Sequence, residues 1–275
     1  MNHALARGHQ GGARVVVVDL GGTWVRVTAS GAGRRAFRGR TPGPAGLPAL
    51  LDRLWRRWRL ARRDVAALGV ASRGVWTPGE RRALARRLRR FASRVVVISD
   101  VEGAYLAALG ADAGVLLLAG TGSIALGRDR RGHFTRAGGL GPLLGDDGSA
   151  FAIGRAWLRT DAVTPVRARR VATAPDAVAR VAALAPSVVR RAGEGHRGAR
   201  LVVREAQRAL ADLAVRAARP LGRRRPVAVS WAGGLLANAR FRAGVWRELR
   251  RRGLRVKPTP PAATAATPAA WRSVL

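Results

Sequence analysis

Carboxylates are scarce in this chain of 275 residues, which has only 16 Asp and Glu side chains, and several of them lie where a ligand could reach them. Asp19 closes the apolar run Val15 to Val18, Asp100 follows a second apolar run, and Asp146 and Asp147 lie in a glycine-rich loop. Strand ends and turns present side chains to ligands, so these positions suit magnesium binding or proton transfer.

Glycine-rich turns follow apolar runs at three places along the chain. They read Gly21-Gly22-Thr23, Gly120-Thr121-Gly122-Ser123 and Gly233-Gly234. Such turns expose backbone N–H groups and let a phosphate approach the main chain. A single turn of this kind is more typical of a plain hairpin, but three of them in order with the aspartates favour a nucleotide site.

Other phosphate-binding and hydrolytic motifs are excluded by the residues themselves. The only lysine, Lys257, precedes Pro258, so the chain has no Walker A loop, and no serine occupies a G-x-S-x-G turn. A G-x-G-x-x-G match at Gly193 to Gly198 follows an arginine-rich segment rather than a buried strand. A dinucleotide-binding fold is therefore not expected.

Cysteine is absent, which excludes disulfides, thiolate zinc sites and cysteine-held iron–sulfur clusters. The longest run without charged residues, Ala113 to Gly127, contains four glycines and is too short for a membrane-spanning helix. No signal peptide is evident. These features predict a cytoplasmic protein with no membrane partner.

The net charge of +35 comes from 51 Lys and Arg residues, which recur through almost every segment. A specific nucleic-acid site usually concentrates its cations on one face or in one arm. The scatter indicates an arginine-biased composition with no specific nucleic-acid partner, although nonspecific attraction of polyanions is expected at low salt.

The order of elements predicts an α/β fold, and one strand–turn–strand pattern occurs twice. Strands are predicted at Val15 to Val18 and Val25 to Thr28 around the first glycine turn, and at Val115 to Leu118 and Ile124 to Gly127 around the second. Two halves that each begin strand, glycine turn, strand predict two domains, 1–109 and 110–275.

Periodicity predicts further elements between these landmarks. Strands are expected at 35–40, 68–71, 95–98 and 227–230, and helices at 47–58, 79–91, 100–109, 149–159, 200–219 and after Gly234. The segment between 159 and 200 reads as irregular, and the Pro/Ala/Thr-rich tail 258–268 reads as loop.

Five motifs together resemble a known family. They are DLGGT (19–23), SD (99–100) before a helix, AGTGSIALG (119–127), GGLGPLLGDDGSAFAIG (138–154) and AGGLLAN (232–238). This series is similar to the N-acetylglucosamine kinase group of the BadF/BadG/BcrA/BcrD ATPases, within the actin-like superfamily of sugar kinases. The resemblance covers roughly residues 14 to 250 and implies two ribonuclease-H-like domains with a nucleotide and sugar cleft between them.

The resemblance also implies roles for individual residues, with ATP and Mg²⁺ as cofactors. The implied ATP-binding residues are Asp19, Gly21, Gly22, Thr23, Gly120, Thr121, Gly122, Ser123, Gly233, Gly234 and Asn238, of which Asp19 would also hold magnesium through water. The implied sugar-binding residues are Asp100, Thr121, Gly139, Leu140 and Asp146.

Asp100 resembles the catalytic base of that family. A carboxylate just beyond a strand end is suited to take the proton from an attacking hydroxyl. The residues alone leave a second interpretation equally open, in which Asp100 only caps the N-terminus of the helix that follows it.

The function implied is ATP-dependent phosphorylation of N-acetylglucosamine or glucosamine, with the 6-hydroxyl as the expected acceptor and a homodimer as the expected assembly. The chain departs from the family pattern in the Gly43-Pro44-Ala45-Gly46 loop, which lacks an asparagine for the sugar. This departure and the charge of +35 leave open a catalytically impaired sugar or nucleotide sensor. A second alternative within the same fold is an ATPase that acts on a partner protein.

Overall fold

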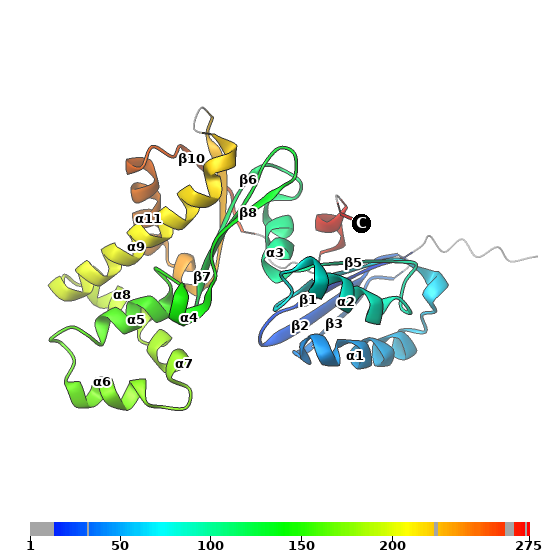
Figure 1. Ribbon diagram of the computed structural model, residues 1–275, viewed down its shortest axis with the longest axis horizontal. Coiled ribbons are helices and arrows are strands. Elements are labelled where there is room, and N and C mark those ends of the chain that lie inside the picture. The colour runs from blue at the N-terminus through cyan, green and yellow to red at the C-terminus, as the bar shows by residue number, and fades with distance from the viewer. Residues whose placement is uncertain (1–13, 32, 223–224, 262–266, 273) are drawn as a thin grey trace, which may run out of the picture. The chain divides into compact units, whose positions relative to one another are not determined.

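The computed structural model describes residues 14–31, 33–222, 225–261, 267–272 and 274–275, which form two compact units (Figure 1). Unit 1 ends at Gly110 and also takes in the described C-terminal residues from 267 onward. Unit 2 runs from Ala111 to Pro261.

Unit 1 is a five-stranded mixed sheet in the order β3-β2-β1-β4-β5 with helices on both faces. β1 pairs antiparallel with β2 and parallel with β4. Its elements are β1 (Arg14–Leu20), β2 (Trp24–Ala29), β3 (Arg35–Arg40), α1 (Gly43–Trp58), β4 (Val65–Ser72), α2 (Pro78–Leu88), β5 (Arg94–Ser99) and α3 (Asp100–Leu109).

Alternation along β1 explains which helices cover which face. Val16 and Val18 belong to the cluster that includes buried residues of α1 and α2, whereas Val17 contacts the cluster with Leu106 of α3. Successive strand residues point to opposite faces. Asp19 therefore lies on the same face as Val17, the face that α3 covers.

Unit 2 repeats the sheet of unit 1 in the order β10-β9-β6-β7-β8, with the antiparallel and parallel pairings at equivalent places. Its strands are β6 (Gly114–Ala119), β7 (Ser123–Arg128), β8 (Phe134–Gly138), β9 (Val227–Ala232) and β10 (Val256–Pro258). Its helices are α4 (Gly141–Leu144), α5 (Ala150–Trp157), α6 (Pro165–Ala172), α7 (Ala177–Ala182), α8 (Ala185–Gly193), α9 (Arg197–Ala218), α10 (Gly234–Ala237) and α11 (Ala239–Arg251).

The segment between 159 and 200 is helical, so the prediction of irregular structure there was wrong. Helices α6, α7 and α8 are short, and α7 and α8 gain stability by packing rather than by length. Val188 of α8 and Leu210 of α9 are fully buried in one cluster. The starts were marked in the sequence, because Thr164 caps α6 and prolines occupy the first turns of α6 and α8.

The C-terminal residues pack with unit 1, whereas the sequence predicted them in the second domain. Trp271 is fully buried and belongs to one core cluster with Val17, Ala71 and Leu106. Gly69 of β4 makes room for its ring, because a Cβ there would lie 2.6 Å from the indole. The residues that follow the predicted loop 258–268 thus supply a core residue to unit 1.

We expect Trp271→Ala to lower the free energy of unfolding of unit 1 by about 3 to 5 kcal/mol, because it removes a fully buried indole. Urea unfolding followed by circular dichroism would measure the loss. Leu201→Ala, at a side chain that is 53% exposed on α9, is the control and should change the midpoint little. Equal effects of the two substitutions would contradict the assignment.

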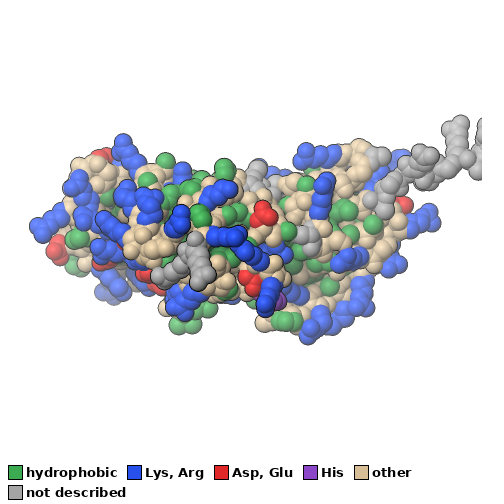
Figure 2. Space-filling view, turned by 90° about the horizontal axis from the view of Figure 1, so that it is seen from above, with side chains coloured by type: hydrophobic (Ala, Val, Ile, Leu, Met, Phe, Trp, Pro, Cys, Tyr) green, Lys and Arg blue, Asp and Glu red, His purple; other side chains and the backbone are tan. Residues whose placement is uncertain are grey.

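Arginine side chains are distributed over the surface rather than gathered in one patch, as Figure 2 shows for one face. Some of them form ion pairs, such as Arg190 with Glu194 one helical turn away and Arg252 with the more distant Asp212. Among the described helices, none is long and apolar enough to cross a membrane.

Candidate active site

Three parallel strands of unit 1, β1, β4 and β5, end side by side at one edge of the sheet. Leu20 at the end of β1 lies beside Ser72 at the end of β4, and Ser72 lies beside Ser99 at the end of β5. The glycine turn follows Leu20, and the backbone N–H of Gly21 donates to the Trp24 carbonyl at 3.0 Å. Residues 21–23 and Asp100, far apart in sequence, therefore follow strand ends at one edge.

Asp19 holds its carboxylate in an ion pair across the β1–β2 hairpin. Its Oδ2 accepts from Arg26 Nη1 at 3.1 Å, and the Asp19 side chain is 15% exposed. The described residues contain no cluster of three or more acidic or histidine side chains able to hold a metal. Mg²⁺ in nucleotide sites commonly needs only one or two carboxylates, completed by phosphates and water, so Asp19 beside the glycine turn fits this role.

Ser99 caps helix α3, which removes the interpretation of Asp100 as the cap. The Ser99 hydroxyl accepts from the Glu102 N–H, and Glu102 Oε2 accepts from the Ser99 N–H at 2.8 Å, which completes a capping box. Glu102 is itself paired with Arg81 of α2 at 2.9 Å. Asp100 is thereby fixed at the first helical position with its carboxylate not needed for capping.

Burial raises the pKa of the half-buried Asp100 carboxyl above the ordinary value of 3.8, and the negative charge of Asp19 acts in the same direction. The Val101 N–H, which donates to Asp100 Oδ1 at 3.0 Å, and the cation of Arg73 oppose this and lower the pKa. Burial dominates, so the ionised form of Asp100 costs free energy in the folded protein.

A raised pKa gives Asp100 a defined effect on stability. The folded state binds the proton of the Asp100 carboxyl more tightly than the unfolded state does. This group therefore contributes stability that is fully present below its ordinary pKa of 3.8 and that is lost as the pH rises through its pKa in the folded state. We expect Asp100→Asn to be more stable than the wild type at pH 7, by about 1.4 kcal/mol for each pH unit between the two pKa values.

Urea unfolding at pH 7 and at pH 3.5 would measure this difference, which should vanish at the lower pH. Asp161→Asn, at an exposed aspartate of unit 2, is the matched control and should leave stability unchanged at both values. A destabilised Asp100→Asn at pH 7 would contradict the cost assigned to this charge.

The second glycine turn, in unit 2, is tied to the loop that carries Asp146. Asp146 is 8% exposed and adopts a left-handed conformation with φ of 60°, which is uncommon for a residue with a side chain. Its Oδ1 accepts from the Ser123 N–H at 3.1 Å, and the Ser123 hydroxyl donates to the Asp147 carbonyl at 2.7 Å. The two segments therefore hold each other in place.

Two further predicted glycines pack against this turn. Gly233 has φ of 94°, and a Cβ there would lie 2.2 Å from the Ala119 carbonyl oxygen. Gly139 donates its N–H to the Ser123 carbonyl at 2.9 Å and has φ of 71°. The structure thus brings the loops at 120–123, 139–146 and 233–234 together within unit 2.

The remaining predicted residues of unit 2 include one helix cap and two exposed side chains. The Asn238 side chain caps α11, since its Oδ1 accepts from the Phe241 N–H at 2.9 Å. The helix expected after Gly234 is consequently divided into α10 and α11. Thr121 is exposed at the tip of its turn, and Leu140 is 62% exposed.

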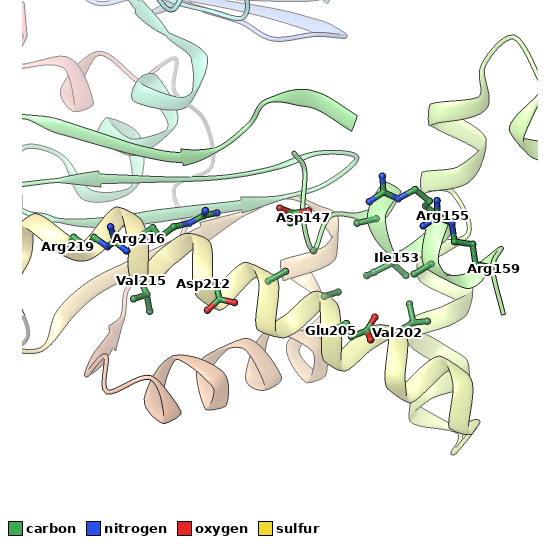
Figure 3. Close-up of a pocket in the computed structure, with 15 residues that line it drawn as sticks. Asp147, Ile153, Arg155, Arg159, Val202, Glu205, Asp212, Val215, Arg216 and Arg219 are labelled. Atoms are coloured by element: carbon green, nitrogen blue, oxygen red, sulfur yellow. The ribbon is translucent and has the colours of Figure 1, made fainter. Parts of the chain in front are cut away.

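A cavity of about 700 Å³ lies between α5 and α9, behind the Asp146 loop (Figure 3). Asp147, Arg155, Glu205 and Asp212 are among its lining residues. None of the residues predicted from the sequence to bind ATP or sugar lines it, and all of those residues are described. This cavity therefore adjoins the loop that carries Asp146 without including any of the predicted residues.

We expect Gly122→Ala to destabilise unit 2 by about 1 to 3 kcal/mol, because a Cβ there would lie 2.8 Å from both carboxylate oxygens of Asp146. Gly120→Ala in the same turn is the matched control, since nothing lies within 4 Å of its Cβ position. Thermal unfolding of both variants would test this. Equal stability of the two would show that Asp146 moves away without cost.

Two arginines at the unit 1 edge were missed by sequence reasoning. Arg26 pairs with Asp19, and Arg73 follows β4 directly. In a chain with 51 basic residues, a single arginine carries no signal of its own. The position of Arg73 just after an apolar strand and before Gly74 was the one available indication.

A model of the BadF/BadG/BcrA/BcrD ATPase family matches residues 10–268. The chain belongs to this family. The predicted family is thereby confirmed, and membership of an ATPase family implies ATP as the nucleotide.

Two curated relatives of this BadF-family chain match over short segments. A segment of 64 residues is 36% identical to the N-acetylmuramic acid/N-acetylglucosamine kinase of Clostridium acetobutylicum and covers 23% of this chain and 21% of the relative. A segment of 46 residues is 54% identical to the N-acetyl-D-glucosamine kinase of Dictyostelium discoideum and covers 17% and 14%. The matched parts are thus about a fifth or less of each relative's length.

Solved structures match over nearly the whole chain. The structure described as an N-acetylglucosamine kinase from Chromobacterium violaceum has a TM-score of 0.64 at 22% identity, covering 92% of this chain and 96% of that one. Its counterpart from Porphyromonas gingivalis has a TM-score of 0.63 at 19% identity, covering 90% and 95%. A ROK family protein from Streptococcus pneumoniae, in complex with sucrose, has a TM-score of 0.55 at 15% identity, covering 94% and 96%. These likenesses confirm the predicted α/β fold with two mixed sheets.

Proposed function

We propose that this BadF-family protein is an ATP-dependent kinase for N-acetylglucosamine or glucosamine, with the 6-hydroxyl as the acceptor. The observation that carries the proposal is the edge of the unit 1 sheet, where the charge of Asp19 acts on Asp100 beside the glycine turn and where Ser99, not Asp100, caps α3. The kinases named among the relatives and the solved structures support the same substrate class.

The proposed reaction is a phosphoryl transfer to a sugar hydroxyl. The hydroxyl oxygen attacks the γ-phosphorus, a new P–O bond forms, and the bond to the bridging oxygen breaks so that ADP leaves with the electron pair. Asp100 takes the hydroxyl proton as the attack proceeds. The raised pKa of Asp100 makes its carboxylate a stronger base than an ordinary aspartate.

The remaining predicted residues would bind and orient the substrates. Mg²⁺ held by Asp19 would neutralise phosphate charge when bound. In unit 1 the N–H groups of 21–23 would contact phosphate, and in unit 2 those of 120–123 would do so. Gly233 and Gly234 would line the adenosine site with Asn238, while Thr121, Gly139, Leu140 and Asp146 would contact the sugar. Mg²⁺ as the ion, a homodimer and a cytoplasmic location belong to the same proposal.

The experiment is ADP release with Mg-ATP across N-acetylglucosamine, glucosamine, N-acetylmannosamine, N-acetylmuramic acid and glucose. We expect turnover with an amino sugar and a loss of about a hundred- to ten-thousand-fold in kcat for Asp100→Asn, because the proton acceptor is removed. ATP affinity should persist in this variant, and Asp161→Asn is the control with the same chemical change.

The outcomes separate the alternatives. Undiminished turnover in Asp100→Asn would remove its assignment as the base. ATP binding without stimulation by any sugar would contradict the kinase and favour an ATPase that acts on a partner, or a sensor.

A further inference from the structure

Arg73 is fixed by its backbone next to the first glycine turn. It follows Ser72, the last residue of β4, which lies beside Leu20 in the parallel register. The Arg73 N–H donates to the Leu20 carbonyl at 2.9 Å, which extends the pairing by one residue beyond the strand. The start of the side chain is therefore set by the sheet, although the residue lies outside it.

The Arg73 guanidinium lies directly over Gly22. A Cβ built on Gly22 would lie 2.2 Å from Arg73 Nη1, so the missing side chain of this glycine is what admits the cation. At Gly21, by contrast, the nearest atom is the Trp24 carbonyl oxygen at 3.4 Å. The turn expected to face phosphate thus has a guanidinium against its second glycine.

The Arg73 guanidinium is available to a ligand, because it is not paired with a carboxylate among the described residues. Arg26 pairs with Asp19 and Arg81 pairs with Glu102, but none of the ion pairs formed by the described residues includes Arg73, and its side chain is exposed. It is nevertheless close enough to Asp100 to favour the ionised form of that carboxyl. An exposed guanidinium between a glycine turn and the candidate base has its donors available for a ligand.

We propose that Arg73 binds the terminal phosphate of ATP and stabilises the charge that develops on it during transfer. This inference rests on the proposed kinase function. A guanidinium presents donors in a planar fork that matches two phosphate oxygens, and it stays charged at any working pH. Placed at the glycine turn, it supplies positive charge that backbone N–H groups alone provide only in part.

The assignment separates ATP from ADP, because only ATP carries the phosphate that Arg73 would contact. Calorimetry with Mg-ATP and Mg-ADP at about 150 mM salt would compare the wild type with Arg73→Met and Arg73→Lys. We expect Arg73→Met to weaken ATP binding about tenfold or more, to change ADP binding less than about threefold, and to lower kcat about a hundredfold. Arg73→Lys should restore part of the ATP affinity and less of the kcat, since it lacks the fork.

Arg63→Met is the matched control. Arg63 is an exposed arginine of unit 1 that makes none of the hydrogen bonds or ion pairs given for the described residues, and its loss changes the net charge by the same amount. The control is needed because a protein with a charge of +35 attracts nucleotides nonspecifically. Equal effects of Arg63→Met and Arg73→Met would overturn the inference.

The readouts keep this inference distinguishable from the proposed function. If the wild type binds ATP but no sugar stimulates turnover, the kinase proposal fails, while the ratio of ATP to ADP affinity still decides the role of Arg73. Unchanged ATP affinity and unchanged kcat in Arg73→Met would overturn the inference alone. A lowered kcat with unchanged ATP affinity, and with the acid limb of the pH–rate profile moved to higher pH, would assign Arg73 to Asp100 instead of to phosphate and would also overturn it.

Discussion

The parallel register of three strands is the constraint on which the unit 1 site depends. β1, β4 and β5 end side by side, so whatever follows each strand meets at one edge. The residues that follow are the glycine turn, Arg73 and Asp100. A shift of one residue in the pairing of β1 with β4 would turn Asp19 to the opposite face of the sheet, away from the face that α3 covers.

Apolar packing on the face of the sheet that α3 covers supports this register. Trp271 fills the space above Gly69 and belongs to one core cluster with Val17 of β1 and Leu106 of α3. The capping box of Ser99 and Glu102 then sets where α3 begins, and Arg81 fixes Glu102 from α2. Asp100 is therefore positioned by apolar burial, a helix cap and one ion pair, none of which uses its own carboxylate.

Unit 2 reaches a similar arrangement by a different means. Its sheet repeats the order of unit 1, but its loops are held by hydrogen bonds between them and by close contacts at glycine. Gly233 lies against the Ala119 carbonyl, and Gly122 lies against the Asp146 carboxylate. Asp146 adopts a left-handed backbone conformation there, and the hydrogen bond that its carboxylate accepts from the Ser123 N–H helps to offset the free-energy cost of this conformation.

The sequence by itself determined the family, the two strand–turn–strand openings and the positions of the aspartates, because these depend on short-range patterns of apolar runs, glycine and acidic residues. It missed helices α6 to α8, whose high arginine and alanine content hides the few apolar residues that pack α7 against α5 and α8 against α9. The cap of α3 was also present in the sequence although it was not used, since Ser99 and Glu102 stand at the spacing of a capping box. Only the tertiary structure decided that the C-terminal residues join unit 1 and that Arg73 lies over Gly22. Both depend on contacts between residues far apart in the chain, which local spacing does not encode.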